Sequence, residues 1–239
     1  MSGGIILITG ASSDIGLALI ECLASYPEPP VILAHCNSGA DRLPATVHPL
    51  VCDLGNVDSV AALAEKILAE YACPDQVVHL PALKLRYERF TKFDWQRFET
   101  DLRIQVQSAV ILLKRLLPAM AKMPGARIVF VSSSVTRGVP PKFMSMYTVV
   151  KQAQLGLMRS LAAEYAETNI SVNAVSPGMV ETRFLEDLPD MVKEMSARSI
   201  PRHRNAAPAD VVNAIEFLLS PKAGYITGIE LPVTGGAVY

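Results

Sequence analysis

A tyrosine and a lysine stand four residues apart in the second half of the chain, as Tyr147 and Lys151 in Ser-Met-Tyr-Thr-Val-Val-Lys. On a helix, residues at this spacing share one face, so both side chains can reach one small cavity. A phenol has an ordinary pKa of about 10, and a neighbouring ammonium favours its ionised form. The pair predicts a proton donor and a group that tunes its acidity, although a solvated or buried helix face shows the same spacing.

Strand-sized apolar runs alternate with helical patterns along the chain. The runs cover residues 4–9, 31–33, 48–52, 76–80, 127–132, 170–175 and 229–233. Helical spacing of apolar residues covers 57–71, 94–122, 145–167 and 209–219. The alternation predicts a single α/β domain over residues 1–239, a Rossmann-type doubly wound parallel sheet of about seven strands with helices on both faces. Such sheets bind ligands at the carboxyl ends of their strands.

The composition argues against several classes of protein. The formal net charge is -1, from 22 basic and 23 acidic residues, so no overall field favours nucleic acid or an anionic membrane. The longest apolar stretches, such as 109–113, are far shorter than the ~20 residues that span a bilayer. No basic segment precedes the first apolar run, so we expect a cytoplasmic protein without a secretory signal. The four cysteines have no partners at metal-ligand spacing, which predicts buried thiols and no metal site.

A glycine-containing turn follows the first apolar run, in Thr-Gly-Ala-Ser-Ser-Asp-Ile-Gly from Thr9 to Gly16. Gly10 closes the strand and Gly16 opens the next helix, so backbone N–H groups can approach a pyrophosphate that the helix N-terminus also favours. A tight strand-to-helix turn is the alternative interpretation. Asp53, at the end of the third strand, is placed either to accept a hydrogen bond from an adenine amino group or to cap the following helix.

The full set of motifs resembles the short-chain dehydrogenase/reductase family, and most closely its 3-oxoacyl-[acyl carrier protein] reductases, over essentially the whole chain. The shared positions are the glycine turn, Asp53, Ser134, Tyr147, Lys151, Ser176-Pro-Gly178 with Thr182, Thr227-Gly228 and Gly235-Gly236. The resemblance implies hydride transfer between a nicotinamide and a carbonyl or alcohol, with Tyr147 as proton donor. It implies that Lys151 holds the nicotinamide ribose and that Ser134 binds the carbonyl oxygen.

The resemblance also implies a set of cofactor-binding residues, with Thr182 at the nicotinamide carboxamide. They are Gly10, Ser12, Ser13, Asp14, Ile15, Gly16, Asn37, Ser38, Asp53, Leu54, Pro81, Tyr147, Lys151, Pro177, Gly178, Val180 and Thr182.

Three positions depart from the family pattern. Asp14 replaces a glycine of the turn, and we expect it to cap the helix and point away from phosphate. His79-Leu80-Pro81-Ala82 replaces Asn-Asn-Ala-Gly, and we expect His79 to be structural. Gln105 occupies the position of a catalytic asparagine; it keeps the amide, so we expect it to support the same proton-relay water.

The end of the second strand, residues 33–38, carries no acidic side chain, which permits the 2′-phosphate of NADP. We therefore expect NADP(H), with Asn37, Ser38 and Arg42 near the phosphate, while NAD(H) stays possible. For the substrate we expect residues 135–146 and a lid around 183–205.

The substrate-contacting residues that we predict are Phe143, Met144 and Phe184, whose apolar side chains suit an acyl or ring substrate. Basic residues between 198 and 204 would meet an acyl carrier protein or its phosphopantetheine, or else form a solvated end of the lid.

The sequence thus predicts an NADP(H)-dependent ketoreductase of the 3-oxoacyl-[acyl carrier protein] reductase type, assembled as a homotetramer or homodimer. Two other hypotheses stay open. One is an NAD-dependent alcohol dehydrogenase that works in the oxidative direction. The other is a catalytically silent family member that senses the dinucleotide and acts through a partner; the changes at Asp14, His79 and Gln105 motivate it, whereas the intact Ser134, Tyr147 and Lys151 argue for an active enzyme.

Overall fold

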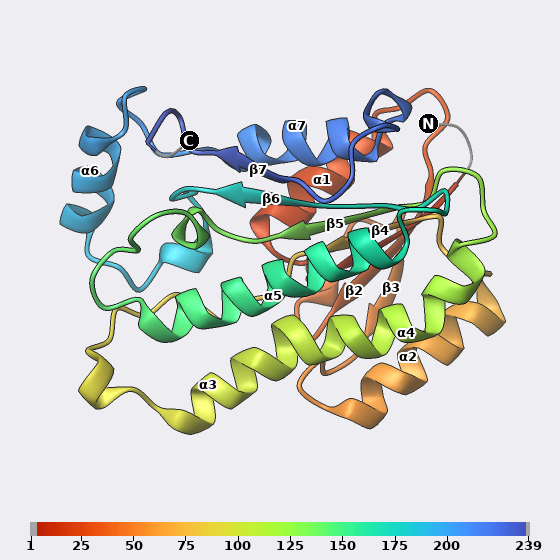
Figure 1. Ribbon diagram of the computed structural model, residues 1–239, viewed down its shortest axis with the longest axis horizontal. Helices are drawn as coiled ribbons and strands as arrows, with labels where there is room; N and C mark the ends of the chain where they lie inside the picture. The colour runs from red at the N-terminus through yellow and green to blue at the C-terminus, as the bar shows by residue number, and fades with distance from the viewer. Residues whose placement is uncertain (1–3, 238–239) are drawn as a thin grey trace.

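The apolar runs form the strands of one parallel sheet in the computed structural model, which describes residues 4–237 (Figure 1). The strands are β1 (Ile5–Thr9), β2 (Val31–Cys36), β3 (His48–Val51), β4 (Gln76–His79), β5 (Arg127–Val131), β6 (Ser171–Pro177) and β7 (Glu230–Val233). They are ordered β3-β2-β1-β4-β5-β6-β7 across the sheet. All carboxyl ends therefore meet at one edge, and the chain order reverses between β1 and β4, where such sheets bind their ligands.

The predicted helices are present as well, and the segment predicted as a lid contains a further helix. They are α1 (Asp14–Ala24), α2 (Val57–Glu70), α3 (Trp95–Leu102), α4 (Ser108–Met120), α5 (Ser145–Glu164), α6 (Asp190–Ser199) and α7 (Pro208–Leu219). Short 3-10 turns are η1 (Ala40–Arg42), η2 (Phe90–Lys92), η4 (Ser134–Thr136), η5 (Arg183–Leu185) and η6 (Pro221–Ala223). The helix expected over residues 94–122 is interrupted, because the π-helical turn η3 (Arg103–Gln107) joins α3 to α4. Such single π turns are frequently found at functional sites.

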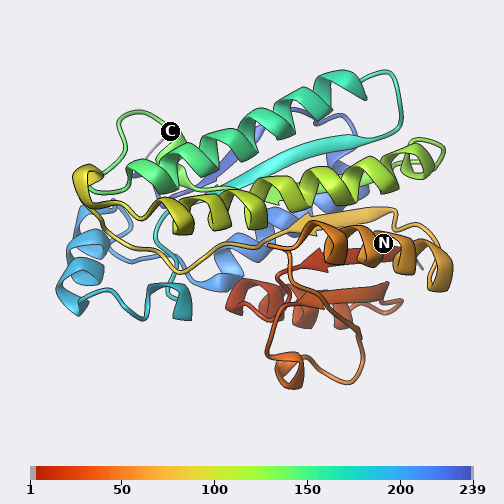
Figure 2. The same ribbon diagram turned by 90° about the horizontal axis from the view of Figure 1, so that it is seen from below.

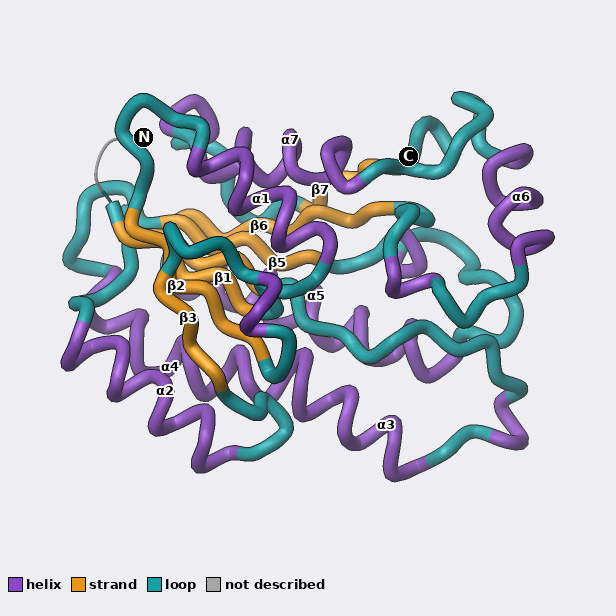
Figure 3. The backbone as a smooth tube through the Cα atoms, turned by 180° about the vertical axis from the view of Figure 1, so that it is seen from behind, coloured by secondary structure: helices purple, strands orange, loops and turns teal. Residues whose placement is uncertain are grey.

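Successive strand side chains point to opposite faces of the sheet and build two cores. On β1, Leu7 faces the core that α2, α4 and α5 cover, whereas Ile6 and Ile8 face the core of α1 and α7. Figure 2 shows α2, α4 and α5 side by side in front of the sheet, and Figure 3 shows α1 and α7 on the opposite face. Burial on both faces explains why the strands read as continuous apolar runs.

An aromatic cluster marks the start of α3. The Trp95 ring lies 5.9 Å from Phe93 and 5.5 Å from Phe98, centroid to centroid, and Phe90 lies 5.7 Å from Phe93. The Trp95 indole also donates a hydrogen bond of 2.9 Å to Glu99. Trp95 and Phe90 stay largely exposed, so the cluster forms an apolar end of the molecule beside the carboxyl edge of the sheet (Figure 1).

Within the described part of the chain, every helix is too short or too polar to cross a bilayer.

Candidate active site

A cavity of about 1020 Å³ opens at the carboxyl edge of the sheet. It brings together the turn after β1, the end of β2, the loop after β4, the start of α5 and the segment after β6. Predicted cofactor residues that line it are Gly10, Ser12, Ser13, Asp14, Ile15, Asn37, Ser38, Asp53, Leu54, Pro81, Tyr147, Lys151, Pro177, Gly178, Val180 and Thr182. Met144 and Phe184 line it too, whereas Gly16, Gln105 and Phe143 do not.

The turn after β1 is shaped to admit a phosphate. Gly10 has a φ of 73°, in the left-handed region that favours glycine. A Cβ on Gly16 would lie 2.5 Å from the carbonyl oxygen of Ala11, so only glycine fits there. The first turn of α1 therefore lies close against the preceding loop, and its free N–H groups form a cradle that suits the pyrophosphate of a dinucleotide.

The helix start differs from the prediction in two details. The first helical residue is Asp14 rather than Gly16, and the N-cap is Ser13, whose hydroxyl accepts a hydrogen bond of 3.1 Å from the Gly16 N–H. Asp14 is therefore not the cap. Its carboxylate instead forms ion pairs with Arg183, at 2.8 Å, and Arg42, at 3.3 Å.

A buried histidine on β2, His35, binds the turn after β1. The His35 ring accepts a hydrogen bond of 3.2 Å from the Gly10 N–H at Nδ1, and its Nε2 lies 3.0 Å from the Cys52 carbonyl oxygen. A carbonyl can only accept, so the proton is on Nε2. Burial lowers the pKa of His35, which keeps the ring neutral and suited to this role. No periodicity or residue spacing in the sequence indicates this role of His35.

Tyr147 and Lys151 lie on the first turns of α5 and face the cavity, with the ammonium 5.8 Å from the centre of the phenol ring. The Lys151 Nζ donates hydrogen bonds to the Val131 carbonyl, at 2.9 Å, and to the Gln154 side-chain oxygen, at 3.5 Å. Burial lowers the pKa of Lys151 to about 8, although the nearby Asp101 carboxylate opposes the shift.

Burial also raises the pKa of Tyr147, with smaller raising effects from Asp101 and Tyr87 and an opposing effect of its hydrogen bond with Ser133. The lowering of this pKa by Lys151, which the spacing predicts, is not among these effects, and the loss of solvation dominates. At neutral pH the phenol keeps its proton, as a proton donor must.

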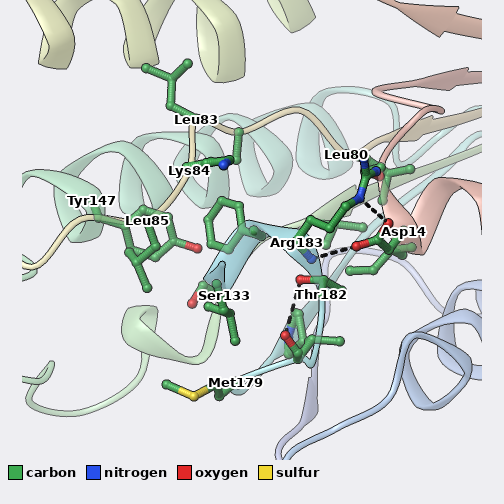
Figure 4. A pocket seen from close by; sticks show the side chains of 18 of the residues that line it. Asp14, Leu80, Leu83, Lys84, Leu85, Ser133, Tyr147, Met179, Thr182 and Arg183 are labelled. Carbon is green, nitrogen blue, oxygen red and sulfur yellow. Dashed lines mark hydrogen bonds and ion pairs between the residues drawn. The ribbon is translucent and has the colours of Figure 1, made fainter. Parts of the chain in front are cut away.

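The neighbour of the predicted Ser134, Ser133, interacts with the phenol. Ser133 is buried in the loop after β5, and its hydrogen bond to Tyr147 lowers the pKa of the phenol. Figure 4 shows the two side chains on the same side of the cavity. Ser134 lines the cavity but begins η4. The only signal for Ser133 is the run of serines from 132 to 134, because counting back thirteen residues from Tyr147 selects Ser134.

Gln105 lies in the π turn η3, buried beneath the cavity. Its Nε2 donates a hydrogen bond of 2.6 Å to Asp101, and its Oε1 is buried with no hydrogen-bond partner among residues 4–237. His79 lies 3.0 Å from the Gln105 carbonyl through Nε2 and 2.8 Å from the Thr9 hydroxyl through Nδ1. Burial lowers the pKa of His79 to about 3, so a neutral ring joins β1 to η3 in a structural position.

Of two further predicted residues, Asp53 agrees with the first of its two predicted roles, whereas Phe143 lies elsewhere than expected. Asp53 does not cap α2: its carboxylate accepts from the Gly55 N–H at 2.8 Å, and Asn56 is the N-cap. This leaves Asp53 in the cavity wall. Phe143 is exposed outside the main cavity, where the Arg89 guanidinium lies 6.0 Å from its ring centre.

The basic residues at the end of the lid are partly neutralised within the chain. Arg204 forms two hydrogen bonds with Asp210, at 2.6 and 2.9 Å, and Arg198 lies 3.7 Å from Glu194. These contacts favour the alternative of a solvated lid end.

Comparison with known proteins agrees with this architecture. The family described as "Enoyl-(Acyl carrier protein) reductase" matches residues 23–238. The chain is 30% identical to "3-oxoacyl-[acyl-carrier-protein] reductase FabG" of Thermotoga maritima, over 100% of this chain and 99% of the relative. It is 32% identical to the "Uncharacterized oxidoreductase YmfI" of Bacillus subtilis, over 96% and 97% respectively.

A solved structure is similar over the same extent. The L-sorbose reductase of Gluconobacter frateurii, complexed with NADPH and L-sorbose, superposes with a TM-score of 0.87 and 26% identity, covering 99% of this chain and 97% of that one. The cavity with its phosphate cradle and the tyrosine–lysine pair, together with these matches, show that the chain belongs to the short-chain dehydrogenase/reductase family and is an NAD(P)-dependent oxidoreductase.

Proposed function

We propose that this protein reduces a ketone with NADPH and that its substrate is a 3-oxoacyl thioester or a similar apolar ketone. One observation carries the proposal: a protonated Tyr147 phenol, the Ser133 hydroxyl and the Lys151 ammonium share one cavity with the phosphate cradle of the glycine turn.

The residues have separate tasks in the proposed reaction. When bound, the nicotinamide supplies the hydride that attacks the carbonyl carbon. Ser133 donates a hydrogen bond to the carbonyl oxygen and stabilises the charge that develops there. Tyr147 then transfers its phenolic proton to that oxygen, which completes the alcohol. Lys151, buried beside the phenol, holds the nicotinamide ribose and supplies positive charge as Tyr147 loses its proton.

The proposed preference for NADPH rests on the end of β2. Asn37 and Ser38 line the cavity there, and no acidic side chain follows β2 until Asp41. A carboxylate at this strand end would repel a 2′-phosphate and bind a ribose 2′-hydroxyl instead. The similar L-sorbose reductase was solved with NADPH, which agrees with this preference.

The proposed substrate class rests on the rest of the cavity wall. Apolar side chains come from the loop after β4, from η4, from the start of α5 and from the proposed lid over residues 183–205. They include Leu83, Leu85, Val135, Met144, Phe184, Leu185, Val192 and Met195. Such a surface suits an acyl chain better than a sugar, and the Thermotoga relative carries the name of a 3-oxoacyl-[acyl-carrier-protein] reductase.

The test follows NADPH absorbance with a panel of ketones and 3-oxoacyl thioesters, free and attached to acyl carrier protein. Turnover of the thioesters with NADPH is the expected result. Faster oxidation of alcohols with NAD would favour the alcohol dehydrogenase instead, and dinucleotide binding without turnover of any compound would favour a silent sensor. The homotetramer or homodimer and the cytoplasmic location stay predictions.

A further inference from the structure

The base of the proposed lid is bound to the glycine turn. Arg183, the first residue of η5, donates its backbone N–H to Asp14 Oδ2 at 2.7 Å and its Nε to Asp14 Oδ1 at 2.8 Å. Its Nη2 donates to the Ser12 carbonyl at 3.0 Å. These bonds join positions at least 169 residues apart in the chain.

A second guanidinium reaches the same two acceptors from the β2 side. Arg42 donates to the Ser12 carbonyl at 2.7 Å and to Asp14 Oδ1 at 3.3 Å. Two arginines thus surround one carboxylate, and the three side chains together carry one net positive charge. Without its two partners, a carboxylate at the first residue of α1 would repel an anion in the cradle.

The position of the bridge relates it to the cofactor. Asp14, Arg42, Thr182 and Arg183 all line the cavity. Figure 4 shows Arg183 extended from the segment after β6 to Asp14 on α1, with Thr182 beside it. The Asp14 carboxylate therefore holds the N–H that directly follows Thr182, the residue expected at the nicotinamide carboxamide.

We propose that Asp14 is a positioning residue for cofactor retention: it fixes Arg183, so that the segment Thr182–Leu185 stays closed against the phosphate cradle while the dinucleotide is bound. The inference rests on the proposed function, because it needs a dinucleotide in this cavity. The Asp14 carboxylate accepts more than one hydrogen bond and the Arg183 guanidinium donates more than one, so the pair holds a single relative orientation.

The solvent exposure of the Asp14–Arg183 ion pair determines how its effect on cofactor release should depend on salt. The Arg183 side chain is 51% exposed and the Asp14 side chain 23%, so salt screens the attraction. Asp14 should therefore slow the release of the cofactor, and this effect should weaken as salt is added.

The experiment measures NADPH dissociation by stopped-flow fluorescence, at low and high salt, for wild type, Asp14→Asn, Arg183→Met and the double variant. Loss of a charge-assisted pair at this exposure should speed dissociation about two- to fivefold in Asp14→Asn at low salt. High salt should speed dissociation from the wild type but barely change the variant.

The double variant separates this role from simple destabilisation. Arg183→Met leaves the carboxylate with one partner fewer beside the phosphate, so it should weaken NADPH binding more than Asp14→Asn does. Adding Asp14→Asn to Arg183→Met should then restore part of the affinity. If the bridge only stabilises the fold, the second substitution restores no affinity, and the losses of affinity follow the falls in melting temperature.

Glu65→Gln is the matched control, because it breaks the exposed Arg115–Glu65 pair of 3.1 Å outside the cavity. Its dissociation rate should equal that of the wild type. Unchanged, salt-independent dissociation from Asp14→Asn would overturn the positioning role alone. A wild-type protein that binds neither NADPH nor NADH would overturn the proposed function as well.

Discussion

Gln105 directs its amide nitrogen at Asp101, one helical turn earlier, across 2.6 Å. Because the nitrogen donates in that direction, the amide oxygen points the opposite way, where it is buried without a partner among residues 4–237. Asp101 also accepts from the Leu83 N–H at 3.3 Å, so its carboxylate joins the π turn to the loop after β4. The pair fixes the amide and leaves a buried acceptor that a relay water can satisfy.

Gln105 is the residue whose replacement distinguishes an adapted site from a purely structural one. Gln105→Ala should lower kcat with little change in NADPH affinity, whereas Gln105→Asn should keep measurable activity because the amide survives. The measurements are kcat, NADPH affinity and melting temperature for both variants. A fall in stability and affinity without a selective fall in kcat would assign Gln105 a structural role.

Tyr147→Phe should reduce turnover by about 10²–10⁴-fold, the range of general acid catalysis. The ring and its packing against Phe184, at 6.3 Å, survive this change. Circular dichroism and NADPH titration should therefore match the wild type. Near-normal turnover would show that another group supplies the proton.

The two neighbouring serines form a matched pair of variants. Ser133→Ala should lower kcat by about 10²–10³-fold, as expected for the loss of one donor to a developing oxyanion. Ser134→Ala removes the same atom one residue later and should stay within a few fold of the wild type. A larger loss of kcat in Ser134→Ala than in Ser133→Ala would instead assign the hydrogen bond to the carbonyl oxygen to Ser134.

The rate of ketone reduction should fall as the pH rises through about 8. Burial holds the pKa of Lys151 below its ordinary value, to about 8, so the ammonium is charged below this pH and loses its proton above it. Asp101 raises this pKa, and Asp101→Asn should therefore move the decline to lower pH while it preserves an acceptor for Gln105. A pH–kcat profile of both proteins tests this, and identical profiles would contradict it.

Cofactor preference should respond to a single substitution at the end of β2. Wild type should bind NADPH more tightly than NADH, and Asn37→Asp should reverse the order because its carboxylate repels the 2′-phosphate and accepts from the ribose hydroxyls. Fluorescence titration with both dinucleotides measures the change. Tighter NADH binding by the wild type would rule out the proposed preference.

The fold could be predicted because its signals are local. Continuous apolar runs such as Ile5–Thr9 and the spacing of apolar residues in Val57–Glu70 define elements within a few residues of their observed ends. The Tyr147–Lys151 pair was visible for the same reason, since one helix face fixes the spacing of its residues.

The remaining site residues depend on contacts that spacing does not encode. The conformation of the loop after β5 determines which of the three consecutive serines contacts the phenol of Tyr147. The partner of Asp14 lies on another segment of the fold, and Asp101 reaches Gln105 through a π turn that no sequence pattern indicated. A family resemblance says which positions matter, but these departures gain their meaning only from neighbours in space.

The aromatic cluster at the start of α3 provides the protein with its own optical probe. Trp95 is the single tryptophan of the chain, so all indole emission arises at this one position. It lies on the helix that carries Asp101, beyond a loop whose residues Leu80 to Leu85 line the cavity. Ligand-induced movement of this loop and helix can therefore be followed in the unlabelled protein as a change of indole fluorescence, in real time and without an engineered dye.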